Sequence, residues 1–292
     1  MDINRMKPNS IEVYEMSNDL HRNTPVPLKV NGKSMTTPAI NINSKLLVPL
    51  QEVFESVGAR VKVNETFTTA TVRINDFSFQ VAAGETQVTI SEPDSTTLSL
   101  DHPVLYEDGE LFVSVRLALT VLKAKLGRES EAGIVTIETL PENDLKVTSP
   151  AFEAWGNIPQ RFVQHSVGGE NISLPIKWTG APTNTKSFAV VVYDAHILHE
   201  YWVHWAVVNI DSNTAEIAEN ATESLTGQQQ IKPYYGMQPA ELTGDHAYQI
   251  AVYALDIERV EVPNQVVFFE DLAPILDSHT LASGTLVSFF QS

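Results

Sequence analysis

The stretch SFAVVVYDAHILHEYWVHWAVVNI, residues 187–210, contains two runs that are apolar almost throughout, separated by a more polar segment. β-Branched and aromatic side chains dominate both runs, 187–194 and 203–210, and this composition is typical of β-strands. Neither run alternates cleanly between apolar and polar residues, which predicts central strands covered on both faces. A third run of the same kind, YQIAVYALD, spans 248–256. The region from residue 145 onward is therefore predicted to be a mainly β domain.

Polar residues stand at the ends of these runs. Asp194 ends the first run, His204 lies at the start of the second, and His246 and Tyr248 open the third, after a loop that contains Gly and Pro. If the three strands are neighbours in one sheet, these four side chains meet at one rim and form a compact hydrogen-bonding pocket. The alternative is a polar plug, in which buried His and Tyr side chains satisfy one another and order the loops without binding anything.

Composition limits the partners. The chain of 292 residues suggests two domains on size alone. Its formal net charge of −17 argues against nucleic acid and against an anionic membrane surface. It has no Cys, which excludes disulfides, thiolate metal sites and thiol nucleophiles. No apolar run approaches the ~20 residues of a membrane span, and the first residues lack the apolar core of a signal peptide.

The first half of the chain contains an internal repeat. Residues 1–24 are polar and indicate a flexible arm. Beyond them, SKLLVPLQEVFESVGARVKV (44–63) is echoed by GELFVSVRLALTVLKAKLGR (109–128). Each copy has apolar residues at i, i+3, i+4 and i+7 and is followed by alternating segments. We therefore expect two units of strand, helix and strand in an α+β domain over residues 25–140, with a linker before residue 145.

These two copies resemble the N-terminal-like domain of copper amine oxidases, a stalk module of bacterial surface proteins. The first copy follows the family pattern well, whereas the second has Ser114 in place of a Pro and Lys123 in place of a Gly. The resemblance implies a spacer or adhesion role without copper or catalysis, because the oxidase's metal lies in a different domain. It also implies an extracellular or cell-surface location, with the export signal absent from this chain; a cytoplasmic location is the alternative.

The second half, residues 145–292, resembles the phosphatidylethanolamine-binding proteins, in their bacterial Raf-kinase-inhibitor-like branch. Five stretches match in order: LKVTSPAFEAWGNIPQRF (145–162), ENISLPIKW (170–178), SFAVVVYD with WVHWAVVNI (187–210), HAYQIAVYALD (246–256) and DSHTLASGTLVSFF (277–290). The family fold is a β-sandwich with short helices and a small anion pocket. Carried onto this sequence, the ligand-binding residues are Asp194, His204, His246 and Tyr248, with Trp202 and Pro239 beside them. Imidazole and phenol groups would donate to phosphate oxygens, and Asp194 would orient an imidazole.

The rim of this pocket departs from the family pattern. The family reads D-P-D-A-P after the first strand, whereas here Asp194 is followed by Ala-His-Ile-Leu at 195–198. In the second loop, 236–240, one proline of three survives, and Ala247 replaces the Arg between the His and the Tyr. Because proline fixes φ, its loss predicts a re-shaped rim. The loss of the Arg removes a cation that would favour a phosphate.

Other kinds of chemistry are open to the same residues. His196 and His199 form an H-x-x-H pair that could supply zinc or copper ligands together with Asp194 and His204. No helix pattern surrounds the pair, so we expect solvent-exposed loop histidines and no metal site. G-x-S-x-G, P-loop and G-x-G-x-x-G motifs are absent, and we predict neither catalytic residues nor a cofactor.

The sequence thus predicts a non-enzymatic binding protein, whose pocket takes a small anionic or phosphorylated ligand or a lipid headgroup and is presented by a stalk-like module. Two alternatives stay open. One is a protein-interaction or inhibitor module of the protease- or kinase-inhibitor type that acts through the loops at 195–201 and 236–245. The other is a metal-dependent or weakly hydrolytic enzyme. A protein partner and a homodimer are both compatible with these expectations.

Overall fold

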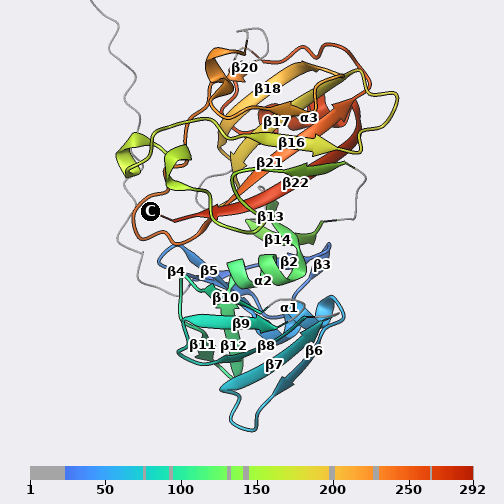
Figure 1. Ribbon diagram of the computed structural model, residues 1–292. Helices are drawn as coiled ribbons and strands as arrows, with labels where there is room; N and C mark the ends of the chain where they lie inside the picture. Colours follow the sequence, from blue (N-terminus) through green and yellow to red (C-terminus); the bar gives the residue numbers. More distant parts are fainter. Residues whose placement is uncertain are drawn as a thin grey trace, which may run out of the picture.

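The computed structural model describes residues 24–74, 77–91, 95–129, 133–140, 145–196, 201–225, 230–263 and 265–291. Figure 1 shows two halves built mainly from strands, with the blue-to-green N-terminal half lying against the yellow-to-red C-terminal half. Of the arm predicted at 1–24, Thr24 is described and the remainder lies outside the described residues.

Three sheets form most of the N-terminal half. The first has the order β1 (Thr24–Val26), β4 (Ala39–Ile42), β5 (Lys45–Pro49), β12 (Glu110–Ser114) and β11 (Leu105–Glu107). The second has the order β10 (Thr96–Ser99), β9 (Gln87–Ser91), β8 (Phe77–Ala82), β7 (Thr69–Ile74) and β6 (Arg60–Val63). The third has the order β13 (Ala124–Glu129), β14 (Ile134–Thr139), β2 (Leu28–Val30) and β3 (Lys33–Ser34).

The two repeated segments each contain one short helix between two strands. Helix α1 (Leu50–Ser56) follows β5 and precedes β6, and α2 (Val115–Leu122) lies between β12 and β13. The apolar spacing accounts for both, since Leu50, Val53 and Phe54 of α1 are all buried. Ser114, which departs from the family's Pro, caps α2 by accepting a hydrogen bond from the Arg116 amide.

Two sheets form the C-terminal half. The smaller has the order β15 (Lys146–Thr148), β16 (Ile176–Thr179) and β19 (Glu216–Ile217). The larger has the order β20 (Gln230–Lys232), β18 (Val203–Asp211), β17 (Ser187–Asp194), β21 (His246–Leu255) and β22 (Thr280–Phe290). Short helices join them: α3 (Ala273–Asp277) and the 3₁₀ turns η1 (Gln160–Phe162), η2 (His165–Val167), η3 (Ala221–Glu223) and η4 (Phe269–Asp271).

The central strands β17 and β21 are buried along their whole length. Alternate residues of β17 enter different cores: Phe188 and Val190 pack toward the smaller sheet with Trp178 and Trp205, and Ala189 and Val191 pack toward the α3 side. This is why the runs show no polar alternation. Trp178 and Trp205 are core residues, 2% and 0% exposed.

The two halves share a packed boundary. Ala195, Ala247 and Phe289 of the C-terminal half belong to the same apolar cluster as the core of the N-terminal half. Across this boundary the Trp155 indole Nε1 donates to the Ala124 carbonyl oxygen at 3.0 Å, and the Gln249 amide donates to the Leu126 carbonyl oxygen. The rim of the sheet that carries the predicted pocket therefore faces the N-terminal half.

Candidate ligand-binding site

The structure brings four of the predicted site residues together. Strand β17 pairs with β18 on one side and with β21 on the other, and Asp194 is the register partner of Tyr248. Asp194 Oδ2 lies 2.7 Å from His246 Nδ1, and the rings of His204 and Tyr248 meet edge to face with centroids 5.2 Å apart. All four side chains are buried.

Hydrogen bonds hold both ring nitrogens of His246. Its Nδ1 donates to Asp194, because an ionised carboxylate can only accept. Its Nε2 lies 2.8 Å from Thr243 Oγ1, and that hydroxyl donates its own proton to the Ala240 carbonyl oxygen at 2.6 Å. Both ring nitrogens of His246 are therefore held by neighbouring groups, Nδ1 by Asp194 and Nε2 by Thr243, which fixes the orientation of the ring.

Tyr248 has a buried hydroxyl group that interacts with the Asp194 carboxylate but forms no hydrogen bond of ordinary geometry with the described residues. Burial raises the pKa of this phenol well above its ordinary value, and the neighbouring Asp194 carboxylate raises it further. The group is therefore a neutral donor at physiological pH. Because buried polar groups normally have partners, this hydroxyl has the capacity to bind something more.

The outer side of the cluster is aromatic. The Trp202 and His204 ring centroids lie 4.5 Å apart, and Trp202 lies 5.4 Å from Tyr235, which is 39% exposed. His204 Nδ1 donates to the Tyr235 carbonyl oxygen at 2.7 Å, which fixes the ring. Lys232 Nζ lies 4.8 Å from the Trp202 ring centroid, so a cation stands near the rim although the family's Arg is Ala247. Pro239 is buried in the loop that leads to Thr243.

His196 corrects an expectation drawn from the sequence. The sequence favours an exposed loop histidine at this position, whereas the residue is only 5% exposed. Asp194 Oδ1 accepts from the His196 amide at 2.8 Å, which bends the chain back in an Asx turn. The His196 ring then stacks on His246, and its Nε2 donates to the Ser44 carbonyl oxygen of the N-terminal half at 2.9 Å. His199, the other member of the H-x-x-H pair, lies outside the described residues.

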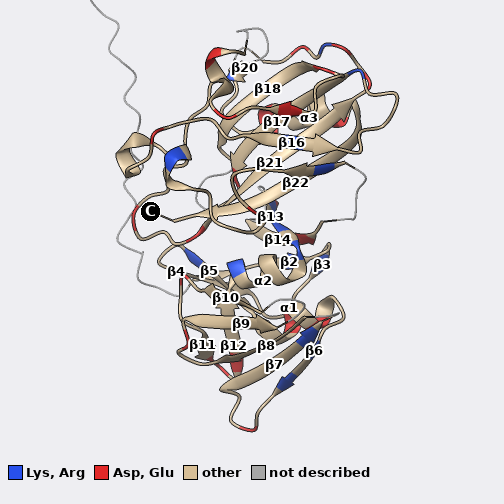
Figure 2. Ribbon diagram, in the orientation of Figure 1, with Lys and Arg blue, Asp and Glu red and all other residues tan. Residues whose placement is uncertain are grey.

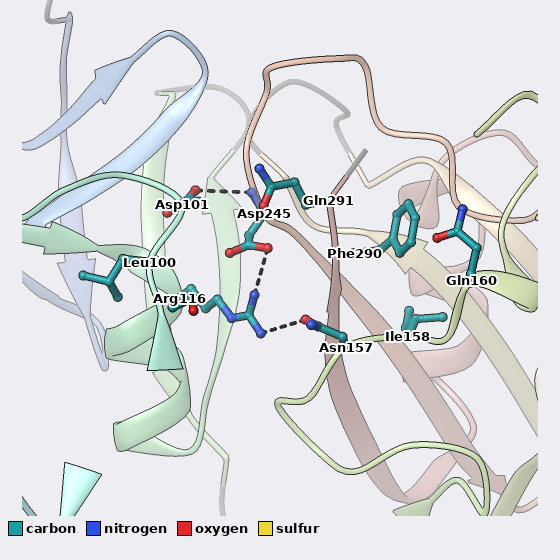
Figure 3. Close-up of a pocket in the computed structure, with 10 residues that line it drawn as sticks. Leu100, Asp101, Arg116, Asn157, Ile158, Gln160, Asp245, Phe290 and Gln291 are labelled. Atoms are coloured by element: carbon teal, nitrogen blue, oxygen red, sulfur yellow. Dashed lines mark hydrogen bonds and ion pairs between the residues drawn. The ribbon is translucent and has the colours of Figure 1, made fainter. Parts of the chain in front are cut away.

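The N-terminal half also holds the loop that precedes His246. Arg116 of α2 donates to Asp245 Oδ1 at 2.9 Å and to Asn157 Oδ1 at 2.7 Å (Figure 3). The Asp245 amide donates to Asp101 Oδ2 at 3.2 Å. Burial raises the pKa of Asp245, and Arg116 opposes that shift. These groups border a cavity of ≈ 380 Å³ between the halves.

Sequence reasoning missed Ser44, Arg116, Thr243 and Lys232. Thr243 alone carries a local signal, because it lies three residues before His246 in the same loop. Ser44 and Arg116 meet the site only through the docking of the two halves, 152 residues from His196 and 129 residues from Asp245 along the chain.

Two further findings concern metal sites and membrane-spanning helices. Within the described residues, no group of three or more His, Cys, Asp or Glu side chains could hold a metal ion. Within the same residues, no helix is both long enough and apolar enough to cross a membrane.

The fold and this cluster point to one class, the small β-rich domains with buried polar side chains at one end of a central sheet. The family model for phosphatidylethanolamine-binding protein matches residues 148–291, and that for the copper amine oxidase N-terminal domain matches residues 29–137. The chain belongs, through its C-terminal half, to the phosphatidylethanolamine-binding protein family, and its N-terminal half is similar to the copper amine oxidase N-terminal domain.

Individual relatives are similar to the C-terminal half. UPF0098 protein YbhB of Escherichia coli is 30% identical over 162 residues, which cover 50% of this chain and 99% of the relative. LppC of Mycobacterium tuberculosis, whose name describes a lipoprotein, is 30% identical over 117 residues, 39% of this chain and 56% of the relative. The crystal structure of Escherichia coli YbcL has a TM-score of 0.45 at 23% identity and covers 51% of this chain and 99% of that one.

Proposed function

We propose that this protein binds a small anionic ligand, a free phosphate ester or a phosphorylated headgroup, at the cluster formed by His204, His246 and Tyr248. The observation that carries the proposal is the buried Tyr248 hydroxyl, which interacts with the Asp194 carboxylate but has no hydrogen bond of ordinary geometry among the described residues. A ligand oxygen would satisfy it. The Asp194 carboxylate and the Thr243 hydroxyl hold the His246 ring in place beside this hydroxyl.

The ligand would enter from the side of Trp202 and Tyr235. His196 and Ser44 cover the opposite side of His246, whereas Tyr235 is partly exposed and Trp202 is half-buried. Lys232, stacked on Trp202, would attract an anion to this entrance. In a chain with a net charge of −17, such a local cation matters, because the overall field repels anions. The role of the stalk-like module in presenting the site outside the cell is part of the same proposal.

The test is a titration with inorganic phosphate and with phosphoethanolamine, followed by NMR of the imidazole signals. Binding is expected to shift His204 and His246 and to leave His279, which pairs with Asp256, unmoved. Tyr248→Phe removes one hydroxyl and is expected to weaken binding about tenfold, as for a hydrogen bond to a charged group. His279→Gln is the matched control. Unmoved His204 and His246 signals at millimolar ligand would sink the proposal.

A second candidate function, binding of a protein partner, is favoured by one observation. Leu242 lies in the loop 236–245, and its side chain is 81% exposed. It also has a positive φ of 67°, which is costly for Leu. Binding of a protein partner that buries this side chain would be lost in Leu242→Ser. The same binding would be kept in Leu281→Ser, which changes an exposed Leu elsewhere. Equal capture of a partner by both variants would exclude this loop as the interface.

A further inference from the structure

A second groove between the two halves has properties that the proposed pocket does not explain. It has a volume of ≈ 820 Å³ and is lined on one side by Lys123, Lys125 and Glu138 and on the other by Lys146, Trp155 and Leu286. Figure 1 places β13 and β14 beside β22 at this boundary. The groove is therefore built by both halves together.

The charge of this groove is opposite to that of the chain. Three lysines and one glutamate are the charged residues among its described lining, in a protein whose net charge is −17. Figure 2 marks the Lys and Arg and the Asp and Glu positions along the ribbon. Lys125 Nζ lies 3.2 Å from Glu138, and this ion pair cancels one positive charge. Within the part of the chain that the structure describes, no carboxylate pairs with Lys123 or Lys146. Among the described residues, the exposed side chains of Lys123 and Lys146 are thus the cations that the groove offers to a ligand.

Lys123 is held in a backbone conformation that costs energy. It ends α2 with φ 50° and ψ 48°, the left-handed region that favours Gly. The related repeat pattern has Gly at this position, so the lysine departs from it at a site where Gly would fit better. Trp155, which faces it across the groove, also has a positive φ, 57°. Strained residues of this kind gather at functional sites.

The Lys123 ammonium group lies between aromatic rings. Its Nζ is 4.7 Å from the Trp155 ring centroid and 5.7 Å from that of Phe77. The aromatic rings attract the positive charge of Lys123, but they offer no oxygen acceptor for its three N–H groups. Partial desolvation lowers the pKa of this ammonium group, although the residue as a whole is exposed. An anionic oxygen would replace water as its hydrogen-bond partner.

We propose that this groove binds a small organic anion, with its carboxylate or phosphate held by Lys123 and Lys146 and its apolar part against Trp155 and Leu140. The apolar part follows from the lining, because Trp155 and Leu140 are partly exposed at the groove, whereas Leu145, Val147 and Leu286 border it but are buried. The Trp155 ring is a fixed platform, since its Nε1 is bonded to the Ala124 carbonyl oxygen. This site is separate from the pocket of His204, His246 and Tyr248 and does not depend on it.

The test uses the full chain and octanoate, with octanol as the neutral analogue and inorganic phosphate as the anion without an apolar part. Calorimetry measures affinity, and the assigned Trp155 indole N–H signal reports the location. Lys123→Gly removes the cation and relieves the backbone, so it is expected to fold at least as stably and to bind octanoate about tenfold more weakly. Lys146→Gln gives a second loss, and Lys177→Gln, which alters an exposed lysine paired with Glu216, is the matched control.

Three results would overturn the proposal. The first is that millimolar octanoate produces neither a heat of binding in the calorimeter nor a shift of the Trp155 indole N–H signal. The second is equal affinity of Lys123→Gly and wild type, above all if that variant is also less stable, because Lys123 would then only join the halves. The third is that octanol or phosphate binds as tightly as octanoate. Equal binding of octanol would show that no charge is needed, and equal binding of phosphate would show that no apolar part is needed.

Discussion

The imidazole of His196 lies face to face on that of His246, with ring centroids 3.8 Å apart and ring planes 8° from parallel. His246 is tied to Asp194, and His196 is tied to the Ser44 carbonyl oxygen of the other half. The N-terminal half thus contacts the candidate site directly, through a residue of the segment in which the family usually has two prolines.

Removal of this cover is expected to expose His246. His196→Ala deletes the stacked ring and its hydrogen bond to Ser44, so reagent can reach a ring that is fully buried in the wild type. Modification of His246 by diethyl pyrocarbonate, followed by mass spectrometry, is expected to become markedly faster. The unfolding free energy is expected to fall by about 1–2 kcal/mol, the scale of one buried hydrogen bond with its packing.

The control for this prediction is His165→Ala, which changes an exposed histidine. It is expected to leave the modification of His246 and the stability unchanged. If His246 reacts equally slowly in His196→Ala, then other groups shield it and the stacked ring is not its cover.

Arg116 is expected to dominate the stability of the boundary between the halves. Its side chain is 11% exposed, it bridges Asp245 and Asn157, and the Asp245 side chain is 4% exposed. Arg116→Ala leaves a buried carboxylate without its cation, which costs about 3–5 kcal/mol. Urea denaturation measures this loss. Asp245→Asn in the same background is expected to recover part of it, because the stranded charge is then gone.

The matched control is Arg161→Ala, which breaks an exposed pair with Glu219 and is expected to cost less than about 1 kcal/mol. Equal losses in Arg116→Ala and Arg161→Ala would show that the buried network contributes no more than a surface ion pair.

The sequence predicted those features that local composition controls. The apolar runs define β17, β18 and β21, and because these strands are neighbours, the polar residues at their ends meet as expected. The same reasoning failed for His196, since its burial depends on the Asx turn at Asp194 and on a carbonyl group 152 residues away. Contacts across a boundary between two halves leave no periodic pattern in either segment.

Glu52 is expected to contribute to the loss of unfolding free energy at acid pH. Burial raises the pKa of its carboxyl, but hydrogen bonds from the Thr36 and Thr37 amides, at 2.6 and 2.8 Å, outweigh burial and hold the pKa below 4.5. The unfolded chain therefore binds the proton more readily. The stabilising contribution is present above about pH 4.5 and is lost as the pH falls through the folded-state pKa.

Glu52→Gln is expected to flatten this part of the curve of unfolding free energy against pH, by less than about 1 kcal/mol because the carboxylate is largely solvated. Glu65→Gln, which removes an exposed carboxylate elsewhere in the same half, is the control. Equal acid sensitivity of Glu52→Gln and wild type would contradict the assignment.

Gly236 is expected to tolerate no side chain, although it lies in the loop that differs from the family pattern. A Cβ at this position would lie 2.6 Å from the Phe162 carbonyl oxygen and 2.7 Å from the Gln164 amide nitrogen, both backbone atoms. The Gly236 amide also donates to Asn171 Oδ1 at 2.7 Å, so the loop cannot simply move away. Gly236→Ala is therefore expected to cost about 1–3 kcal/mol by overpacking.

The same substitution at Gly58 separates this effect from backbone strain. Gly58 has φ +86° and open space where a methyl group would lie, so Gly58→Ala is expected to cost only the conformational penalty, about 1 kcal/mol. Thermal unfolding measures both. Because Tyr235 precedes Gly236 and its carbonyl oxygen holds His204, displacement of the loop in Gly236→Ala is also expected to shift the His204 NMR signal, whereas Gly58→Ala leaves that signal in place. An unshifted His204 in a destabilised Gly236→Ala would mean that this loop does not position the site.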